Sequence, residues 1–429
     1  MYAWQVRCRC IPLSARQHWV DNEALRGKFA TFWKRTTAAN TFNIGYPAYT
    51  ALELSVRTMC VQRDEPCWPV SGGPMMNRFL AACIFTLVPF GACAADDFQA
   101  VLEKAREEGS VIVRITNPSA PETHAALEKA FNERFGLSVK LEWTPQGAPQ
   151  TNARIITEAS GGAGSVDLVG LGSAEDVEAL RSRDLLKPYP WVEVFGKELP
   201  ELAKAVDEVI PDLRGTTFNL LDAVYGVGWN TNLIKAEEVP TTTMQLADAK
   251  WNGKLALNAF FLNPLPTIAY VIGQDAMLDY AKQLVENMPI LQRGSPVVMQ
   301  ALSVGQAPLG IITYHAAVAA EKKGQPVGFK LFDDYIMVYQ GYIYVPENAP
   351  HPNAAKLFTA WLASEGYKVA EQFEAIPRLS NEGSEIAQLV SDAQAKAGAK
   401  IAMPVSMSEI KAQEKLRAEL TKLLTGAGN

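Results

Sequence analysis

Two adjacent side chains that could bind a ligand or a metal, Tyr314 and His315, directly follow the apolar strand expected at residues 309–313. A phenol and an imidazole can each coordinate a metal ion or hydrogen-bond to an organic solute. Adjacent residues after a strand can both point into a cleft, so we expect this pair to line a binding site. Packing in the core is the alternative interpretation of His315.

Neutral hydrogen-bond donors follow two other predicted strands. Thr116, Asn117 and Ser119 come after one of them, and Gly172 and Ser173 come after another. Donors beside helix N-termini suit a carboxylate, a phosphonate or another small anion. We therefore expect both loops to lie together at the edge of a crevice, although ordinary turn and cap chemistry would explain the same residue types.

Further candidates lie near strand ends in the second half of the chain. Trp229, Asn230 and Phe260 are placed where they could form the wall of a pocket for an organic ligand. Most aromatic residues in such positions belong to the core, which is the alternative interpretation of Trp229 and Phe260.

Signatures of catalysis are missing from the sequence after residue 95. We find no G-x-S-x-G elbow, no G-x-x-x-x-G-K-[ST] phosphate loop and no H-E-x-x-H pair. The three histidines of this segment, His124, His315 and His351, are far apart in sequence. These observations favour binding over catalysis, so we predict neither an enzyme nor a bound cofactor.

Cysteine and charge are unevenly distributed along the 429 residues. All six cysteines precede residue 94, which excludes a thiolate metal site or a cysteine nucleophile from the rest of the chain. From residue 95 onward there are 30 Lys/Arg and 41 Asp/Glu, a net charge of −11. Such a surface repels phosphates, which argues against a nucleic-acid partner.

A secretory signal peptide is predicted at residues 75–94. Arg78 precedes an apolar run at 79–90, and the run ends in the small residues around Ala94. The run is too short to span a bilayer, which needs about 20 residues. We expect export to the periplasm and cleavage after Ala94, with lipid attachment at Cys93 as the alternative.

The first 74 residues have no secondary-structure pattern that we can read. They carry nine Lys/Arg and five Asp/Glu, and they precede the predicted signal peptide. Because a signal peptide must lie near the start of a chain, our hypothesis is a start codon assigned too far upstream or a disordered extension. A small cysteine-containing domain is the alternative.

The remainder alternates amphipathic helices with short apolar strands. The order helix, strand, helix, strand begins at residue 97, and a second unit of the same kind begins after Gly226. This order predicts α/β lobes with largely parallel strands covered by helices. Ligands bind such sheets at the carboxyl ends of their strands.

Three segments in the same order resemble extracellular solute-binding proteins of family 1, near the ferric-iron-binding branch. They are Tyr225–Asn232, Leu246–Leu257 and Ala349–Phe358. The resemblance implies a two-lobe periplasmic-binding-protein fold of type II, with two mixed sheets flanked by helices and a central ligand cleft. It also implies an ABC importer as the partner, with a permease and an ATPase at the inner membrane, and a monomeric binding protein.

The resemblance leaves the solute open. In the ferric branch two consecutive tyrosines bind iron, whereas this chain has Tyr314 followed by His315 and has no histidine in the first-lobe loop at Thr116. We therefore predict a small organic or oxoanionic solute. Ferric iron held by Tyr314 and His315 is the first alternative, and a polyamine is the second.

The expected division of the chain follows from this fold. We predict the first lobe at residues 96–222 and 332–395, and the second lobe at residues 223–331 and 396–429.

Overall fold

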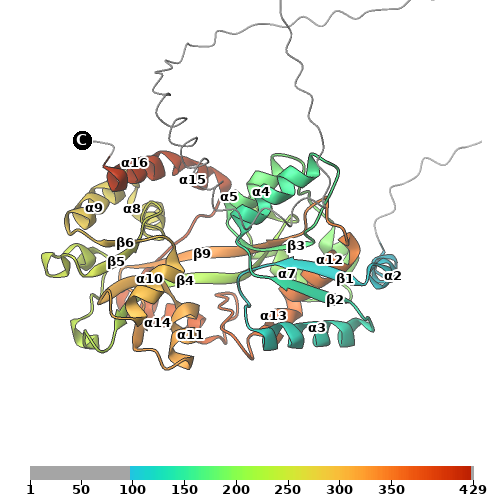
Figure 1. Ribbon diagram of the computed structural model, residues 1–429, viewed down its shortest axis with the longest axis horizontal. Coiled ribbons are helices and arrows are strands. Elements are labelled where there is room, and N and C mark those ends of the chain that lie inside the picture. The colour runs from blue at the N-terminus through green and yellow to red at the C-terminus, as the bar shows by residue number, and fades with distance from the viewer. Residues whose placement is uncertain (1–96, 427–429) are drawn as a thin grey trace, which may run out of the picture. The chain divides into compact units, whose positions relative to one another are not determined.

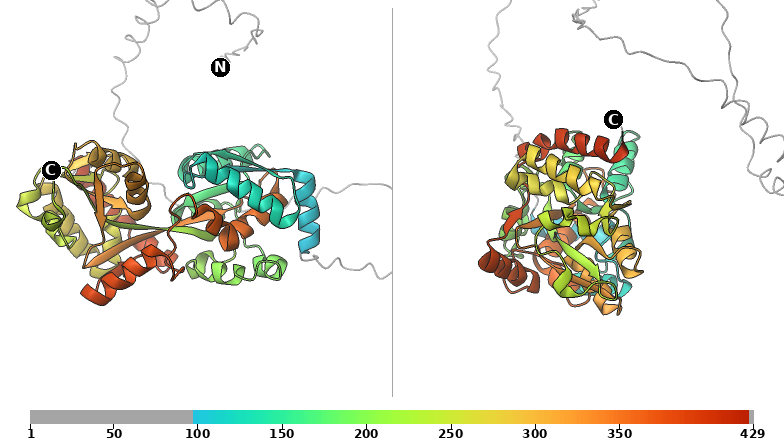
Figure 2. Two further views of the ribbon diagram at one scale, coloured as in Figure 1. Left: turned by 90° about the horizontal axis from the view of Figure 1, so that it is seen from below. Right: turned by 90° about the vertical axis from the view of Figure 1, so that its left-hand side faces the viewer.

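The computed structural model describes residues 97–426, so the predicted upstream segment, the signal peptide and all six cysteines lie outside the described residues. The described chain forms two groups of helices that are joined by two long strands, β4 (Phe218–Asn230) and β9 (Tyr335–Tyr344) (Figures 1 and 2). No helix in this part of the chain combines the length and the apolar character needed to cross a bilayer.

The first group, which we call the first lobe, is built mostly from the beginning of the described chain. Its elements are α2 (Phe98–Glu108), β1 (Ser110–Arg114), α3 (Pro121–Phe135), β2 (Lys140–Thr144), α4 (Ala148–Ala159), β3 (Leu168–Gly172), α5 (Ala174–Arg181), α6 (Trp191–Phe195), α7 (Leu202–Asp207), η2 (Pro211–Leu213), α12 (Pro352–Trp361), the π-helix η7 (Leu362–Gly366) and α13 (Tyr367–Ala370). Leu127 and Phe131, four residues apart on α3, pack in one core with Val111 and Val113 of β1.

The second group, the second lobe, contains most of the later elements. They are η3 (Ala236–Glu238), η4 (Met244–Ala247), η5 (Ala249–Trp251), β5 (Leu255–Asn258), η6 (Leu265–Ile268), α8 (Ala269–Ile272), α9 (Gln274–Glu286), β6 (Ile290–Gln292), α10 (Ser295–Ser303), β7 (Leu309–Thr313), α11 (Tyr314–Lys322), β8 (Val327–Lys330), α14 (Glu385–Ala397), β10 (Lys400–Ala402) and α16 (Glu414–Thr425). Tyr280 and Leu284 of α9 share a core with Leu416 and Leu420 of α16. The short helix α15 (Met407–Ala412) lies between α5 and α16 (Figure 1).

One sheet of ten strands runs through both lobes in the order β2-β1-β3-β9-β4-β7-β5-β6, with β10 beside β9 and β8 beside β4. The predicted α/β class is confirmed, but the expectation of two separate sheets is wrong. The physical reason is the length of β4, which pairs with β9 from Phe218 to Tyr225 and with β7 from Tyr225 to Trp229. Strands β1 to β3 are parallel to one another, as are β5 to β7. β4 and β9 are antiparallel to each other, β9 is antiparallel to β3, and β4 is antiparallel to β7 and β8, whereas β10 runs parallel to β9.

The ends of several helices follow the sequence signals. Gly109 and Gly136 end α2 and α3 in the left-handed conformation. α12 begins at Pro352, and the Asn353 side chain donates to Glu108. Gln413 separates α15 from α16.

Two helices, α14 and α15, each pack with the other lobe than the one predicted for them. Ile386 and Val390 of α14, predicted for the first lobe, share a cluster with Val224 of β4 and with second-lobe residues. Met407 and Ile410 of α15, predicted for the second lobe, pack with the core beneath α4 and α5. The chain therefore passes between the lobes after α13 and again after β10. Apart from these segments, the predicted lobe boundaries stay a prediction.

Candidate functional site

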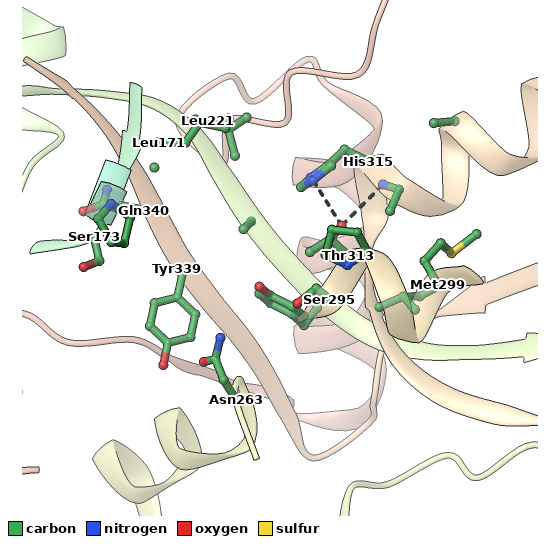
Figure 3. A pocket seen from close by; sticks show the side chains of 18 of the residues that line it. Leu171, Ser173, Leu221, Asn263, Ser295, Met299, Thr313, His315, Tyr339 and Gln340 are labelled. Atoms are coloured by element: carbon green, nitrogen blue, oxygen red, sulfur yellow. Dashed lines mark hydrogen bonds between the residues drawn. The ribbon is translucent and has the colours of Figure 1, made fainter. Parts of the chain in front are cut away.

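A cavity of about 690 Å³ lies where β4 and β9 join the two lobes. Its walls come from α5 and the end of β3 on one side, from α10 and α11 on the other, and from the middle of both long strands (Figure 3). The polar residues of the lining include Ser173, Glu175, Asp176, Asn263, Ser295, Thr313, His315, Gln340 and Arg417. The cavity thus brings together segments that are distant in sequence.

The junction of β7 and α11 supplies a polar pair to this cavity. Thr313 caps α11 by accepting a hydrogen bond from the Ala316 backbone N–H at 3.4 Å, and its Oγ1 lies 3.1 Å from Nε2 of His315 (Figure 3). Nδ1 of His315 is buried and has no hydrogen-bond partner among the described residues. Burial lowers the pKa of His315 to about 4. The imidazole is therefore neutral at pH 7 and offers a hydrogen bond rather than a charge.

Two second-lobe helices begin at the cavity wall. Ser295 and Pro296 open α10, and Thr313 and His315 lie at the start of α11. Neither helix has an acidic residue in its first turn, and no side chain caps α10. The first backbone N–H groups of a helix carry a partial positive charge and lack intrahelical partners. This wall of the cavity therefore favours a negatively charged group.

The helix on the first-lobe wall is neutralised by its own residues. Ser173 caps α5 by accepting from the Asp176 backbone N–H at 3.2 Å, and the Ser173 N–H donates to the Asp176 carboxylate at 2.9 Å. Burial raises the pKa of Asp176. Glu175, in the same first turn, forms an ion pair with Arg417 of α16. The positive end of α5 is thus already paired with carboxylates.

Of the ten side chains predicted from the sequence, the structure brings Ser173 and His315 to the cavity. The other eight do not line it: Thr116, Asn117, Ser119, Gly172, Trp229, Asn230, Phe260 and Tyr314. Gly172 instead packs against Tyr344, since a Cβ atom at this glycine would come within 2.8 Å of the phenol ring.

The loop after β1 is occupied by a carboxylate of the protein itself. The Ser119 backbone N–H and hydroxyl and the Ala120 N–H donate to Glu374, at 2.8 to 3.1 Å, and the Thr123 hydroxyl donates to it at 2.8 Å. Burial raises the pKa of Glu374, but these hydrogen bonds lower it overall. The donors of this loop, which were predicted to bind a solute, are used by the carboxylate of Glu374.

Trp229 and Asn230, at the end of β4, have structural contacts, and the third residue predicted in this group, Phe260, is exposed. Asn230 donates to the Leu302 carbonyl and accepts from the Asn232 N–H, at the far end of β4. The ring of Trp229 packs against Gly328, where a Cβ atom would come within 2.3 Å of the indole. Phe260 is 56% exposed, whereas its neighbour Phe261 lines the cavity.

Tyr314 and His315 point to different cavities. The Tyr314 hydroxyl donates to Glu385 of α14 at 2.7 Å, and its pKa is raised by burial and by this contact. The two residues open a helix rather than end a strand, so their side chains diverge by about 100°. The predicted iron ligands therefore do not converge, and the described residues contain no group of three or more His, Cys, Asp or Glu that could hold a metal.

Several lining residues were missed by the sequence reasoning. Gly294-Ser295-Pro296 is a recognisable helix start, because proline is favoured in the first turn. No local signal marked Gln340 or Arg417, which reach the cavity only through the tertiary fold.

Comparison with known protein families identifies the family of this chain. The sequence pattern of a family described as bacterial extracellular solute-binding protein matches residues 126–399, more than half of the chain. The chain belongs to this family. A search of curated protein sequences finds no match to it.

Solved structures of solute-binding proteins share the fold at low sequence identity. Iron-bound HitA of Pseudomonas aeruginosa is 19% identical, with a TM-score of 0.51 over 75% of this chain and 99% of that one. The substrate-binding protein of an ABC transporter from Agrobacterium tumefaciens is 16% identical, with a TM-score of 0.58 over 75% and 96%. The spermidine/putrescine-binding protein PotD of Streptococcus pneumoniae is 12% identical, with a TM-score of 0.51 over 73% and 99%. These similarities confirm the type II periplasmic-binding fold, which serves iron in HitA and spermidine or putrescine in PotD.

Proposed function

We propose that this member of the solute-binding family is the periplasmic component of an ABC importer, and that it captures a small organic anion in the cavity between its lobes. The observation that carries the proposal is the pair of helix N-termini, those of α10 and α11, that open into the cavity without acidic residues of their own. An anion placed there is favoured by the two helix dipoles, although Pro296 has no N–H and the Val297 and Val298 N–H groups already bond to the Gly294 carbonyl. We propose no catalytic role.

The size of the cavity supports an organic solute rather than a bare ion. Sites for small organic molecules occupy about 300 to 1,000 Å³, and this cavity of about 690 Å³ falls within that range. Leu171, Leu221 and Met299 line it together with the polar groups, so part of the solute surface would be apolar. A single metal ion would leave most of this volume to water.

The two alternative solutes fit the cavity less well. Ferric iron needs converging hard ligands, but the Tyr314 hydroxyl is hydrogen-bonded to Glu385 and does not line the cavity. A polyamine needs unpaired carboxylates, whereas Glu175 is paired with Arg417 and Asp176 is bound by Ser173. A small anion needs neither converging metal ligands nor unpaired carboxylates.

Delivery to a permease would depend on motion of the lobes about β4 and β9. A solute that contacts both walls stabilises the closed arrangement by its differential affinity for it. The partners that we propose are the permease and ATPase of the importer, with the protein acting as a monomer in the periplasm. The net charge of −11 after residue 95 argues against a nucleic-acid partner.

Thermal unfolding of the purified, metal-free protein tests the proposed solute class. The panel is sodium benzoate, hexanoate, succinate and methylphosphonate, with spermidine and ferric citrate as the alternatives. A ligand at about 100 times its Kd stabilises the folded state by about 2.7 kcal/mol, which raises the melting temperature by several degrees. A shift with an anion supports the proposal. A shift only with iron or spermidine, or no shift at all, contradicts it.

A further inference from the structure

An arginine from the C-terminal helix reaches the same cavity. Arg417 belongs to α16, which is anchored in the second-lobe core by Leu416 and Leu420. The Arg417 side chain lines the cavity, and its guanidinium lies 5.5 Å from the centre of the Phe261 ring. It thus places a permanent positive charge at the wall of a cavity that already favours an anion.

A carboxylate of the first lobe binds one terminal nitrogen of the Arg417 guanidinium. Nη1 of Arg417 forms an ion pair with Glu175, which belongs to the first turn of α5. The guanidinium also lies near the Tyr270 hydroxyl, and burial raises the pKa of that phenol to about 12. These contacts fix the orientation of the planar group without using all five of its N–H donors.

One donor of Arg417 is left over. Its Nε is buried and has no hydrogen-bond partner among the described residues. A buried donor without a partner is destabilising, so a ligand that supplies an acceptor there gains affinity. The edge of a guanidinium that contains Nε can bind a carboxylate through two parallel hydrogen bonds.

We propose that Arg417 determines the specificity of the site by binding a carboxylate group of the solute through its Nε edge, while Glu175 holds the guanidinium in place. The inference rests on the proposed function. The apolar lining, which includes Leu171 and Met299, would contact the rest of the solute. The class of ligand is therefore a small monocarboxylate with an apolar body.

The test compares benzoate with benzamide, its uncharged analogue, by titration calorimetry. Wild-type protein should bind benzoate at least about tenfold more tightly than benzamide. Arg417→Lys keeps the charge but loses the planar double contact, so benzoate affinity should fall about tenfold while benzamide affinity changes little. Lys415→Gln removes an exposed charge two residues away on α16 and should leave both affinities unchanged.

Glu175→Gln tests whether Arg417 contacts the solute or only forms a structural ion pair with Glu175. Its amide oxygen still accepts from Nη1 of Arg417 and so keeps the guanidinium in place, while the competing negative charge is removed. Benzoate should therefore bind as tightly as to the wild type or more tightly. If Arg417 acted only by pairing with Glu175, Glu175→Gln would instead weaken benzoate binding as much as Arg417→Lys does, which would overturn the inference. The melting temperature of each unliganded variant verifies that it is folded.

The remaining outcomes distinguish this inference from the proposed function. Equal benzoate affinity in wild type and Arg417→Lys overturns the role of Arg417 and leaves the solute site standing. Binding of methylphosphonate but of no carboxylate overturns the carboxylate class alone. A wild type that binds none of the anions refutes the proposed function and this inference together.

Discussion

Substitution of His315 by asparagine should remove an acid-dependent loss of stability. The folded protein holds this imidazole with a pKa of about 4, lowered from 6.5 by burial. Between these two values the unfolded chain takes up a proton that the folded state does not. The stability contribution of the neutral imidazole is therefore complete above pH 6.5 and decreases as the pH falls toward 4.

The linkage relation gives the size of the effect. A difference of this size in pKa lowers the free energy of unfolding by about 2 kcal/mol between pH 7 and pH 5. In His315→Asn this contribution is absent, and the amide can still hydrogen-bond to Thr313. The wild type should thus lose about 2 kcal/mol more than the variant over this pH range.

Urea unfolding followed by tryptophan fluorescence, at pH 7, 6 and 5, measures the difference directly. The quantity compared is the change in the free energy of unfolding of each protein between pH 7 and pH 5. Any loss of stability that the substitution causes equally at both pH values therefore cancels. If the two proteins lose stability in parallel, the imidazole is not shielded from water, which contradicts the burial of His315 at the start of α11.

Two further substitutions test Tyr314 and the loop around Ser119, which the sequence placed in the site and the structure does not. Tyr314→Phe loses the hydrogen bond to Glu385 and should lower the free energy of unfolding by about 1 kcal/mol. Its anion affinity, measured by calorimetry, should not change. Weaker anion binding would show that the phenol contacts the solute. Glu374→Gln weakens the charge-assisted bonds to the loop before α3 and should destabilise the protein by about 1 to 2 kcal/mol at pH 7. The pKa of Glu374 is lowered in the folded state, so its stabilisation is present above the ordinary carboxyl range and is lost as the pH falls below that range. The urea midpoints of the variant and the wild type should therefore converge in acid. A difference that stays constant with pH would contradict this explanation.

The local pattern of the sequence predicted most of the helices and strands. Helices such as α2 and α3 carry apolar residues at helical spacing and end at a glycine, and both signals are contained in the segment itself. The single sheet could not be predicted in this way. It depends on β4 changing its partner at Tyr225, which is a property of the tertiary fold.

The candidate site was less accessible to sequence reasoning. The donors around Ser119 were predicted to bind a solute, but the group that accepts from them is Glu374, 255 residues away in the chain. Tyr314 and His315 were expected to point the same way, and the start of α11 at Tyr314 separates them. Arg417 enters the cavity from the C-terminal helix, so no neighbouring residue in the sequence indicated its position.

The central claim is that an organic anion occupies the cavity between the lobes. Calorimetric titration of Ala316→Trp with the anion that stabilises the wild type tests it most directly, because Ala316 lines the cavity and an indole there would fill part of it. Gln394→Trp, on the exposed side of α14, is the matched control. We expect Ala316→Trp to abolish binding while the control binds as the wild type does. Unchanged affinity in a folded Ala316→Trp protein would show that the anion binds elsewhere.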